Sequence, residues 1–266
     1  MIIHSYLTDG FYGWAEIFVK SFGYHHGDKY KIILASRDLT EHQIDRLKSF
    51  YPRLEVKNKP LNLRKIASRA NMSIDDIKRL KEHIENNAVT KRTFIWKQAI
   101  SVEDRYRTSI LETMRYYPKE DFLVHFDIDM YFRAPLNDLF NIVRRNDISI
   151  KFREKSQLNR KVMGGLIGFK LNKRTRDFMK RWIYHIDNLP LYKKPLGYGQ
   201  TSFYLAYLDF KRKLKWGDIP GKYISPRFLE SDVIWSGNTK DGKAKNLSKC
   251  QSDFRNILKR GKDETK

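Results

Sequence analysis

The stretch Leu123–Phe132 reads LVHFDIDMYF, an apolar and aromatic run that contains two aspartates one residue apart. Such a run is typical of a strand inside a sheet that is covered on both faces. Removing a carboxylate from water without a partner costs several kcal/mol, so Asp127 and Asp129 should lie where this strand ends. A partner or ligand for the two carboxylates is therefore expected close by.

The segments before this strand alternate between strand and helix patterns. Three short apolar runs are typical of strands: residues 2–7, 31–35 and 54–57. Residues 14–22 carry apolar side chains at helical spacing, and Thr40 followed by Gln43 predicts a capping box at the start of another helix. This β-α-β-α-β order predicts a mostly parallel sheet covered by helices.

The pattern continues beyond the aspartates. The predicted elements are a helix ending near Arg145, strands at 148–152 and 164–171, and helices at 172–190 and 201–210. A helix at 102–116 precedes the aspartate strand, and the polar residues 61–99 predict a helical insertion. The expected fold class is α/β, a Rossmann-like, mixed and mostly parallel central sheet flanked by helices. We expect one domain at 1–240 and a C-terminal tail at 241–266.

The composition excludes several classes of protein. The 266 residues are 41% hydrophobic, which is enough for a globular core. No apolar run approaches the roughly 20 residues that a membrane-spanning helix needs, and the start MIIHSYLTDG resembles a first strand rather than a signal peptide. Cys250 is the only cysteine, which excludes an internal disulfide and a cysteine-built zinc site. These features favour a cytoplasmic protein.

The chain is strongly basic, with a net charge of +22 from 53 Lys and Arg against 31 Asp and Glu. A field of this size concentrates polyanions near the surface. Nucleotide diphosphates, nucleic acid, anionic lipid head groups and acidic glycans would all respond to it. The basic residues are spread along the chain, so an ordinary solvated surface explains most of the charge equally well.

Asp127 and Asp129 have the spacing and position of a metal site. In extended backbone, residues two apart project to the same side, so both carboxylates can reach one ion while Ile128 packs the other way. Ligand sites in open α/β sheets lie at the carboxyl ends of strands. Carboxylates suit Mn²⁺ or Mg²⁺, which keep waters and substrate phosphates in their other positions. A D-x-D arises by chance about once in a chain of this length, so a surface turn is the alternative.

Other short motifs occur in a fixed order around the D-x-D. They are LTDGFY at 7–12, RYRTSILE at 105–112, VMGGLIGF at 162–169, GYGQTSFY at 197–204 and IWSGNTK at 234–240. In this order they resemble glycosyltransferases of the GT-A fold, most nearly glycosyltransferase family eight and its relatives. The resemblance spans residues 2–240, and it depends on the order and spacing of motifs that are individually loose.

The resemblance implies a site for a nucleotide sugar. A metal on Asp127 and Asp129 would hold the diphosphate, and Gln200 would lie beside the anomeric carbon, with Asp129 counted beside it as catalytic. The family's other donor-binding motifs fall on Thr8, Asp9, Tyr12, Arg107 with Arg105 as second choice, Gly164, Gly165, Gly237 and Lys240. Tyr12 could stack on the base, although it is equally well a packed aromatic.

The sequence departs from the family pattern at several positions. Ile234 stands where the family has a metal-binding histidine, so Asp232 or water would have to complete the metal's ligands. Met163 replaces an asparagine, and Gly199 and Thr201 replace the acids beside the glutamine. These differences leave the donor sugar and the retaining stereochemistry open.

The predicted activity is transfer of a hexosyl or pentosyl unit from a nucleoside diphosphate sugar, UDP-linked, to a hydroxyl of a glycan, glycolipid or protein. Mn²⁺ or Mg²⁺ is the expected cofactor. The basic surface is consistent with an acidic or lipid-linked acceptor and with peripheral contact with an anionic membrane; nucleic acid is not expected. Two alternatives remain: a metal-dependent sugar nucleotidyltransferase, for which LTDGFYGW is a poor phosphate loop, and a basic nucleic-acid-binding protein.

Overall fold

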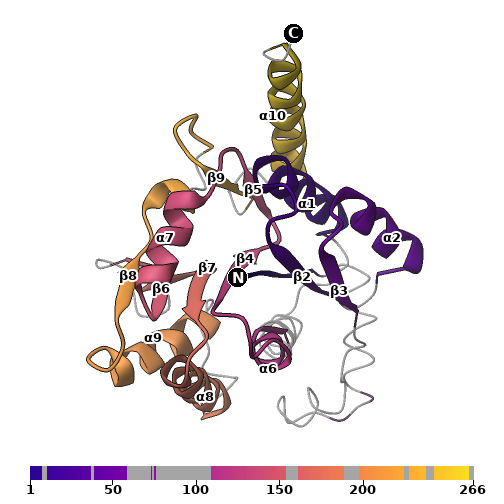
Figure 1. Cartoon of the computed structure of the whole chain (residues 1–266). Coiled ribbons are helices and arrows are strands. Elements are labelled where there is room, and N and C mark those ends of the chain that lie inside the picture. Colours follow the sequence, from indigo (N-terminus) through magenta and orange to yellow (C-terminus); the bar gives the residue numbers. More distant parts are fainter. Residues whose placement is uncertain are drawn as a thin grey trace.

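The structure is a computed structural model that describes residues 1–7, 11–36, 39–58, 73, 75, 109–153, 161–188, 198–224, 228–237 and 243–263 (Figure 1). Its strands are β1 (Ile2–Tyr6), β2 (Lys31–Ser36), β3 (Leu54–Asn58), β4 (Phe122–Asp127), β5 (Met130–Phe132), β6 (Ile148–Phe152), β7 (Val162–Lys170), β8 (Trp216–Asp218) and β9 (Ile234–Ser236). Its helices are α1 (Tyr12–His26), α2 (Glu41–Phe50), α6 (Glu112–Tyr116), α7 (Asn137–Arg145), α8 (Lys173–Asn188), α9 (Tyr198–Phe210), α10 (Lys243–Asp263) and the short 3₁₀ helix η5 (Gly221–Tyr223).

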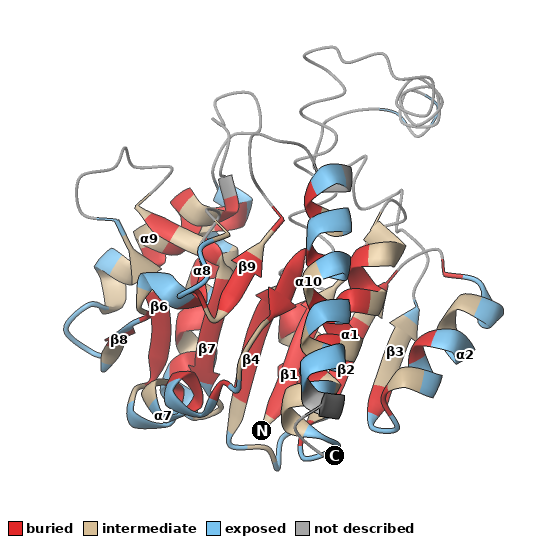
Figure 2. Cartoon of the chain, turned by 90° about the horizontal axis from the view of Figure 1, so that it is seen from above, coloured by how far each residue is buried: buried red, intermediate tan, exposed pale blue. Residues whose placement is uncertain are grey.

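The central sheet of the described residues has the strand order β3-β2-β1-β4-β7-β6-β8. The strands β3, β2, β1 and β4 run parallel, β7 is antiparallel to both of its neighbours, and β6 pairs in parallel with β8. This confirms the predicted mixed, mostly parallel sheet. The strands β5 and β9 form a separate antiparallel pair. Figure 2 shows β1, β2 and β4 pointing the same way, so their carboxyl ends share one edge of the sheet.

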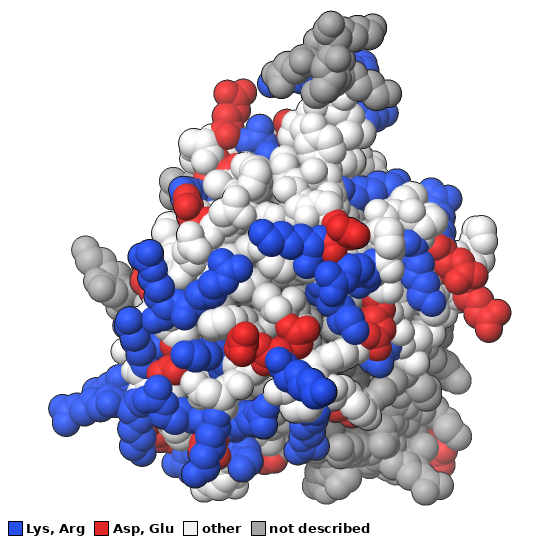
Figure 3. Space-filling model, in the orientation of Figure 1, with Lys and Arg blue, Asp and Glu red and all other residues white. Residues whose placement is uncertain are grey.

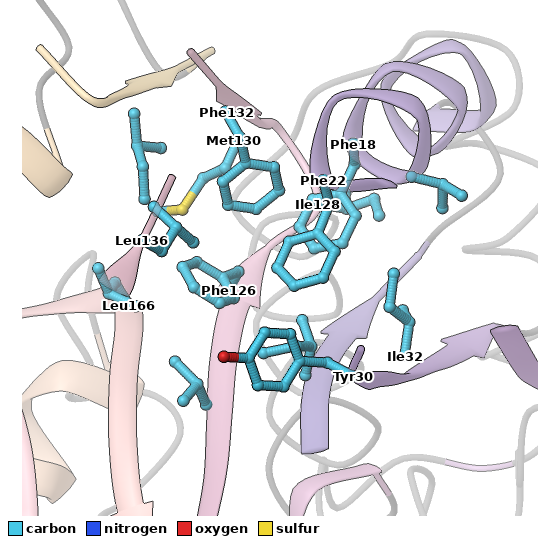
Figure 4. Close-up of a cluster of buried hydrophobic side chains, with 14 of the residues drawn as sticks. Phe18, Phe22, Tyr30, Ile32, Phe126, Ile128, Met130, Phe132, Leu136 and Leu166 are labelled. Atoms are coloured by element: carbon cyan, nitrogen blue, oxygen red, sulfur yellow. The ribbon is translucent and has the colours of Figure 1, made fainter. Parts of the chain in front are cut away.

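Helices cover both faces of the sheet, with α1, α2 and α7 on one face and α6, α8 and α9 on the other (Figure 1). On the first face, Phe18 and Phe22 of α1 pack edge to face against Phe126 of β4 and Phe132 of β5, with ring centroids 5.0–6.3 Å apart (Figure 4). Aromatic pairs prefer this arrangement to a face-to-face sandwich. The stretch that carries the two aspartates is therefore anchored by aromatic side chains on both sides of them.

The predicted helix starts are confirmed by their caps. Thr40 Oγ1 accepts the Gln43 N–H at 3.2 Å, and the Gln43 side chain accepts the Thr40 N–H at 2.9 Å, which completes the capping box of α2. At the start of α8, Asn172 Oδ1 accepts the Thr175 N–H at 3.0 Å, and Thr175 Oγ1 accepts the Asn172 N–H at 3.2 Å. Local side-chain chemistry thus fixes both helix starts.

The segment predicted as a C-terminal tail contains the helix α10, which Figure 1 shows extending away from the sheet. Cys250 and Phe254 of α10 are buried in a cluster with Trp14, Tyr131 and Trp235. The thiol is removed from water, and this burial raises the pKa of Cys250 to about 12. The predicted insertion at 61–99 lies outside the described residues, except for Ser73 and Asp75.

Basic side chains are spread over the face of the molecule seen in Figure 3, most densely on the side that carries β8, α8 and α9. Six exposed basic residues lie in the first turn of α8 and the turn after α9: Lys173, Arg174, Arg176, Lys211, Arg212 and Lys213. In the part of the chain that the structure describes, no helix combines the length and the apolar character needed to cross a membrane.

His26, near the end of α1, makes the fold sensitive to acid. Its Nε2 accepts the Leu136 N–H at 3.2 Å, and its ring packs on Phe22. Burial, together with the nearby His25 and Lys29, lowers the pKa of His26 from 6.5 to about 4. The unfolded chain therefore binds a proton at His26 through a pH range in which the folded chain does not, so stability falls as the pH decreases through this range.

We expect the unfolding midpoint to decrease between pH 6.5 and pH 4, and a His26→Gln variant to lose less over this range. The glutamine carbonyl can still accept the Leu136 N–H, but it does not titrate. Calorimetry across this pH range measures the effect, with His42→Gln on the exposed face of α2 as the matched control. Equal pH dependence in the His26 variant and the wild type would contradict this assignment.

Candidate active site

Asp127 ends β4, and Ile128 and Asp129 form the turn that leads into β5. The predicted extended backbone is therefore wrong beyond Asp127, because the chain turns there to pair with β9. The Asp127 side chain is 31% exposed, and Asp129 is 5% exposed, while Ile128 is buried in the core (Figure 4). Two residues span at most about 7 Å between Cα atoms, and binding of one ion by both carboxylates stays a prediction.

Gly165 of β7 lies against the carboxylate of Asp127. A methyl group at Gly165 would come within 2.8 Å of Asp127 Oδ2 and 3.1 Å of Met130 Cε. The pairing of β6 with β7 is irregular at this point, and residues 164–166 fall outside the β6 register. The strand thus carries bare backbone to the predicted metal ligand, and Gly165 is one predicted residue that the structure places beside it.

Gly237 lies against the backbone and Cβ of Asp129. Its N–H donates to the Asp129 carbonyl at 2.7 Å, and a methyl group there would meet the Trp14 ring at 2.5 Å. Asn246 of α10 donates from Nδ2 to the Gly237 carbonyl at 3.1 Å. Trp14 and Asn246 therefore hold the predicted Gly237 against Asp129. Neither Trp14 nor Asn246 belongs to a recognisable motif. The helix α10 has few apolar positions, so the sequence pattern did not predict this helix.

A chain of buried polar side chains leads to Asp127 from the interior. His4 of β1 and His125 of β4 are register partners and fully buried, with their Nδ1 atoms 2.9 Å apart. His4 Nε2 lies 2.5 Å from Ser109 Oγ, and His125 Nε2 lies 3.7 Å from Asp127 Oδ1. With both rings neutral, one Nδ1 donates and the other accepts, so the two rings hold opposite tautomers. In the sequence, the only sign of this line of polar side chains is a histidine inside each of two apolar strands.

Asp232 or water as the third metal ligand stays a prediction, and the structure shows what surrounds the two positions concerned. Ile234 is fully buried in β9 opposite Phe132, and the Asp232 carboxylate accepts the Leu229 N–H at 3.0 Å within a turn. Among the residues that the structure describes, no three His, Cys, Asp or Glu side chains form a metal-binding group. Two carboxylates alone still suit a hard cation that keeps water and phosphate ligands.

The other predicted residues are placed as follows. Tyr12 begins α1, and its hydroxyl donates to the Gln43 carbonyl of α2 at 3.4 Å; burial and the neighbouring Glu16 raise the pKa of Tyr12. Gln200 is half-buried in the first turn of α9, and Gly164 is buried in β7. Four donor-site predictions and one second choice lie outside the described residues: Thr8, Asp9, Arg107, Lys240 and Arg105. Base stacking by Tyr12 stays a prediction.

No protein-family profile matches the sequence, and no curated protein matches it. Solved structures do match. LgtC, a galactosyltransferase solved with donor and acceptor sugar analogues, has a TM-score of 0.56 at 10% identity, with 95% of each chain covered. The glycosyltransferase GlyE of Streptococcus pneumoniae TIGR4 has a TM-score of 0.53 at 12% identity, over 90% of this chain and 55% of GlyE. The bifunctional glycosyltransferase WbbM has a TM-score of 0.51 at 12% identity, over 84% of this chain and 39% of WbbM.

The matches cover 84–95% of this chain, which spans only about half the length of GlyE and less of WbbM. Structural matches at such low sequence identity are evidence for a shared fold alone. The GT-A-type fold that the motifs predicted is confirmed on this basis, since the chain has the fold of these glycosyltransferases.

Proposed function

We propose that the protein is a glycosyltransferase that uses a nucleoside diphosphate sugar, UDP-linked, with Mn²⁺ or Mg²⁺ held by Asp127 and Asp129. One observation carries the proposal: Asp127 ends the central strand β4 and Asp129 lies in the turn that follows. The bare backbone of Gly165 lies against the Asp127 carboxylate, and that of Gly237 lies against the backbone and Cβ of Asp129. Carboxylate oxygens suit a hard cation, and glycine lets a ligand approach closely. The glycosyltransferases that share the fold support the same reading.

The chemical difficulty in sugar transfer is the departure of the diphosphate with its developing negative charge. A divalent cation held by Asp127 and Asp129 would supply electrophilic stabilisation of this charge. The chain positions these ligands through β4, the β5–β9 pair and the Gly237 hydrogen bond to Asp129. Lys240, which matches the family's diphosphate lysine, would add positive charge there.

Gln200 is the proposed support for the sugar. It lies in the first turn of α9, and α9 packs on β7, the strand that carries Gly165. One of the LgtC structures that shares this fold is an active-site mutant with glutamate in place of a glutamine. In a retaining reaction the leaving diphosphate oxygen would take the acceptor proton, so the protein would need no separate base; in an inverting reaction a carboxylate would have to take it.

Nucleotide binding tests this function directly. We expect UDP together with Mn²⁺ to raise the unfolding midpoint, and each alone to raise it much less, because the metal joins the aspartates to the diphosphate. Ligand at a hundred times its Kd stabilises by about 2.7 kcal/mol, which is roughly 5–10 °C for a chain of this size. A thermal-shift series with UDP, Mn²⁺ and both measures it.

Adding a nucleoside triphosphate, a sugar 1-phosphate and an oligonucleotide to the series separates the alternatives. A sugar nucleotidyltransferase would respond most to a nucleoside triphosphate or a sugar 1-phosphate. A nucleic-acid-binding protein would instead bind oligonucleotides, with an affinity that falls steeply as salt increases. The absence of any metal-dependent response to UDP would contradict the proposed function.

A further inference from the structure

A cavity lies farther along the sheet from the two aspartates. Its volume is about 810 Å³, within the roughly 300–1,000 Å³ of small-molecule sites. It is formed by the end of β6, the start of β7, the strand β8 and the helix α9. Its described lining contains none of the described residues that are assigned to the candidate active site, so it requires an explanation of its own.

Aromatic side chains form one part of the cavity wall. The rings of Tyr204 and Tyr207 are stacked, with centroids 5.5 Å apart and planes 25° apart. Tyr207 is held between Phe152 and Trp216, each with its ring centroid 4.8 Å away. Their packing restricts the motion of Tyr207 before any ligand arrives. Flat aromatic faces carry a negative quadrupole, which attracts the C–H bonds of a sugar ring.

Positive charge forms the other part of the wall. Among the residues that the structure describes, Lys151, Arg153 and Lys161 line the cavity with one carboxylate, Asp218. Lys151 Nζ donates to Asp218 Oδ2 at 2.8 Å, and the Phe152 N–H donates to Asp218 Oδ1 at 3.2 Å, so that carboxylate is already neutralised. The lining therefore has an excess of positive charge, which favours an anionic ligand.

Arg153 is the best-placed group to recognise that anion. Its backbone N–H donates to the Lys161 carbonyl at 2.7 Å, which holds the two strand ends together at the cavity. Its side chain is exposed and has no ion-pair partner within the described ranges. A planar guanidinium can bind a carboxylate or a phosphate through two parallel hydrogen bonds.

The cavity lies beside the candidate active site. Neighbouring strands are about 4.8 Å apart, so β6 lies about 10 Å from β4, with β7 between them. Lys151 pairs with Met163, next to the glycines at Asp127. On α9, Gln200, Tyr204 and Tyr207 follow the spacing i, i+4, i+7, which places them on one face of the helix. This face connects the proposed sugar site with the aromatic wall.

We propose that this cavity binds an anionic sugar unit of the acceptor, a pyranose that carries a carboxylate or a phosphate group. The tyrosine pair packs against the ring, and Arg153 with the neighbouring lysines binds the anion. The assignment of this sugar to the acceptor rests on the proposed glycosyltransferase function. The binding site itself rests on the cavity alone.

Binding of simple sugars tests the proposal. Titration of the whole protein with glucuronate, glucose 6-phosphate and glucose, followed by ligand-observed NMR, compares a carboxylate, a phosphate and a neutral ring. We expect at least one of the anionic sugars to bind about tenfold more tightly than glucose, and Arg153→Gln to remove most of that preference. Arg212→Gln, in the exposed turn after α9, changes the same charge outside the cavity and is expected to have no effect.

Contact with the sugar ring and recognition of its anionic group are tested by separate variants. Tyr204→Ala should weaken all three sugars, since it removes the stacking surface and leaves the cations in place. Equal binding of the three sugars, or equal loss in the Arg153 and Arg212 variants, would overturn the proposal. Preference for glucuronate identifies a carboxylate-bearing sugar, and preference for glucose 6-phosphate identifies a phosphate-bearing one.

Failure of this proposal can be distinguished from failure of the proposed function. The Arg153→Gln variant is expected to keep the full thermal response to UDP with Mn²⁺, because the aspartates are intact. A response to UDP without selective binding of anionic sugars overturns the cavity proposal alone. Selective binding of anionic sugars without a response to UDP leaves the cavity as a sugar site and refutes the transferase.

Discussion

Asp127→Asn is expected to lower metal-dependent turnover of a UDP sugar by about 10²- to 10³-fold, with little change in the unfolding midpoint. Asparagine has the same shape, so the packing against Gly165 is kept, but the amide is a much weaker ligand for a hard cation than a carboxylate. The loss corresponds to the electrostatic stabilisation that one such group typically supplies to a developing charge. Release of UDP measured over a range of Mn²⁺ concentrations would show the effect.

Asp121→Asn is the matched control for this variant. Asp121 is exposed and immediately precedes β4, so the same change of charge occurs at the opposite end of the strand, away from the site. Its turnover and its response to Mn²⁺ should equal those of the wild type. If Asp127→Asn behaved like this control, the aspartate pair would not be the metal site, and the proposed mechanism would fail.

The fold was largely predictable because its elements are encoded locally. Apolar runs at 31–35 and 148–152 became β2 and β6, and the capping residues Thr40 and Asn172 set the starts of α2 and α8. Each of these signals depends on neighbouring residues only. The alternation of strands with helices then left few ways to build the sheet.

The elements that sequence analysis missed depend on distant contacts. The strand β9 has three residues and exists because it pairs with β5 more than a hundred residues earlier. The helix α10 is mostly exposed, and it is held by Cys250 and Phe254 in a cluster with Trp14. Such short or sparse apolar patterns become interpretable only when the partner surface is known.

The candidate site shows the same division. The aspartate pair could be identified from its place at the end of an apolar strand, but the turn after Asp127 could not, because it depends on the β5–β9 pairing. The role of Asn246 in holding Gly237, and the line from Ser109 through His4 and His125 to Asp127, required coordinates. Buried polar networks join side chains across strands, and a linear pattern does not record such joins.

Gly165→Ala is expected to weaken Mn²⁺ binding at least tenfold and to lower turnover by about a hundredfold, although no ligand is removed. The new methyl group would lie 2.8 Å from Asp127 Oδ2, closer than a carbon and an oxygen approach in real structures, so the carboxylate must move. The same methyl group would lie 3.1 Å from Met130 Cε, so two neighbours would crowd it. A ligand displaced by even part of an ångström loses the geometry that a cation and a diphosphate need.

Gly168→Ala separates this effect from ordinary overpacking. Gly168 lies on the same strand, and a methyl group there would clash with Val143 in the core and not with Asp127. It should lower the unfolding midpoint, since overpacking typically costs about 1–3 kcal/mol, while the folded protein keeps its affinity for Mn²⁺. Manganese titration by electron paramagnetic resonance, on variants shown to be folded by circular dichroism, compares the two. If both variants lost stability and neither lost metal affinity, Gly165 would only be a packing position. A selective loss at Gly165 would mean that β7 sets the position of the metal ligand on β4.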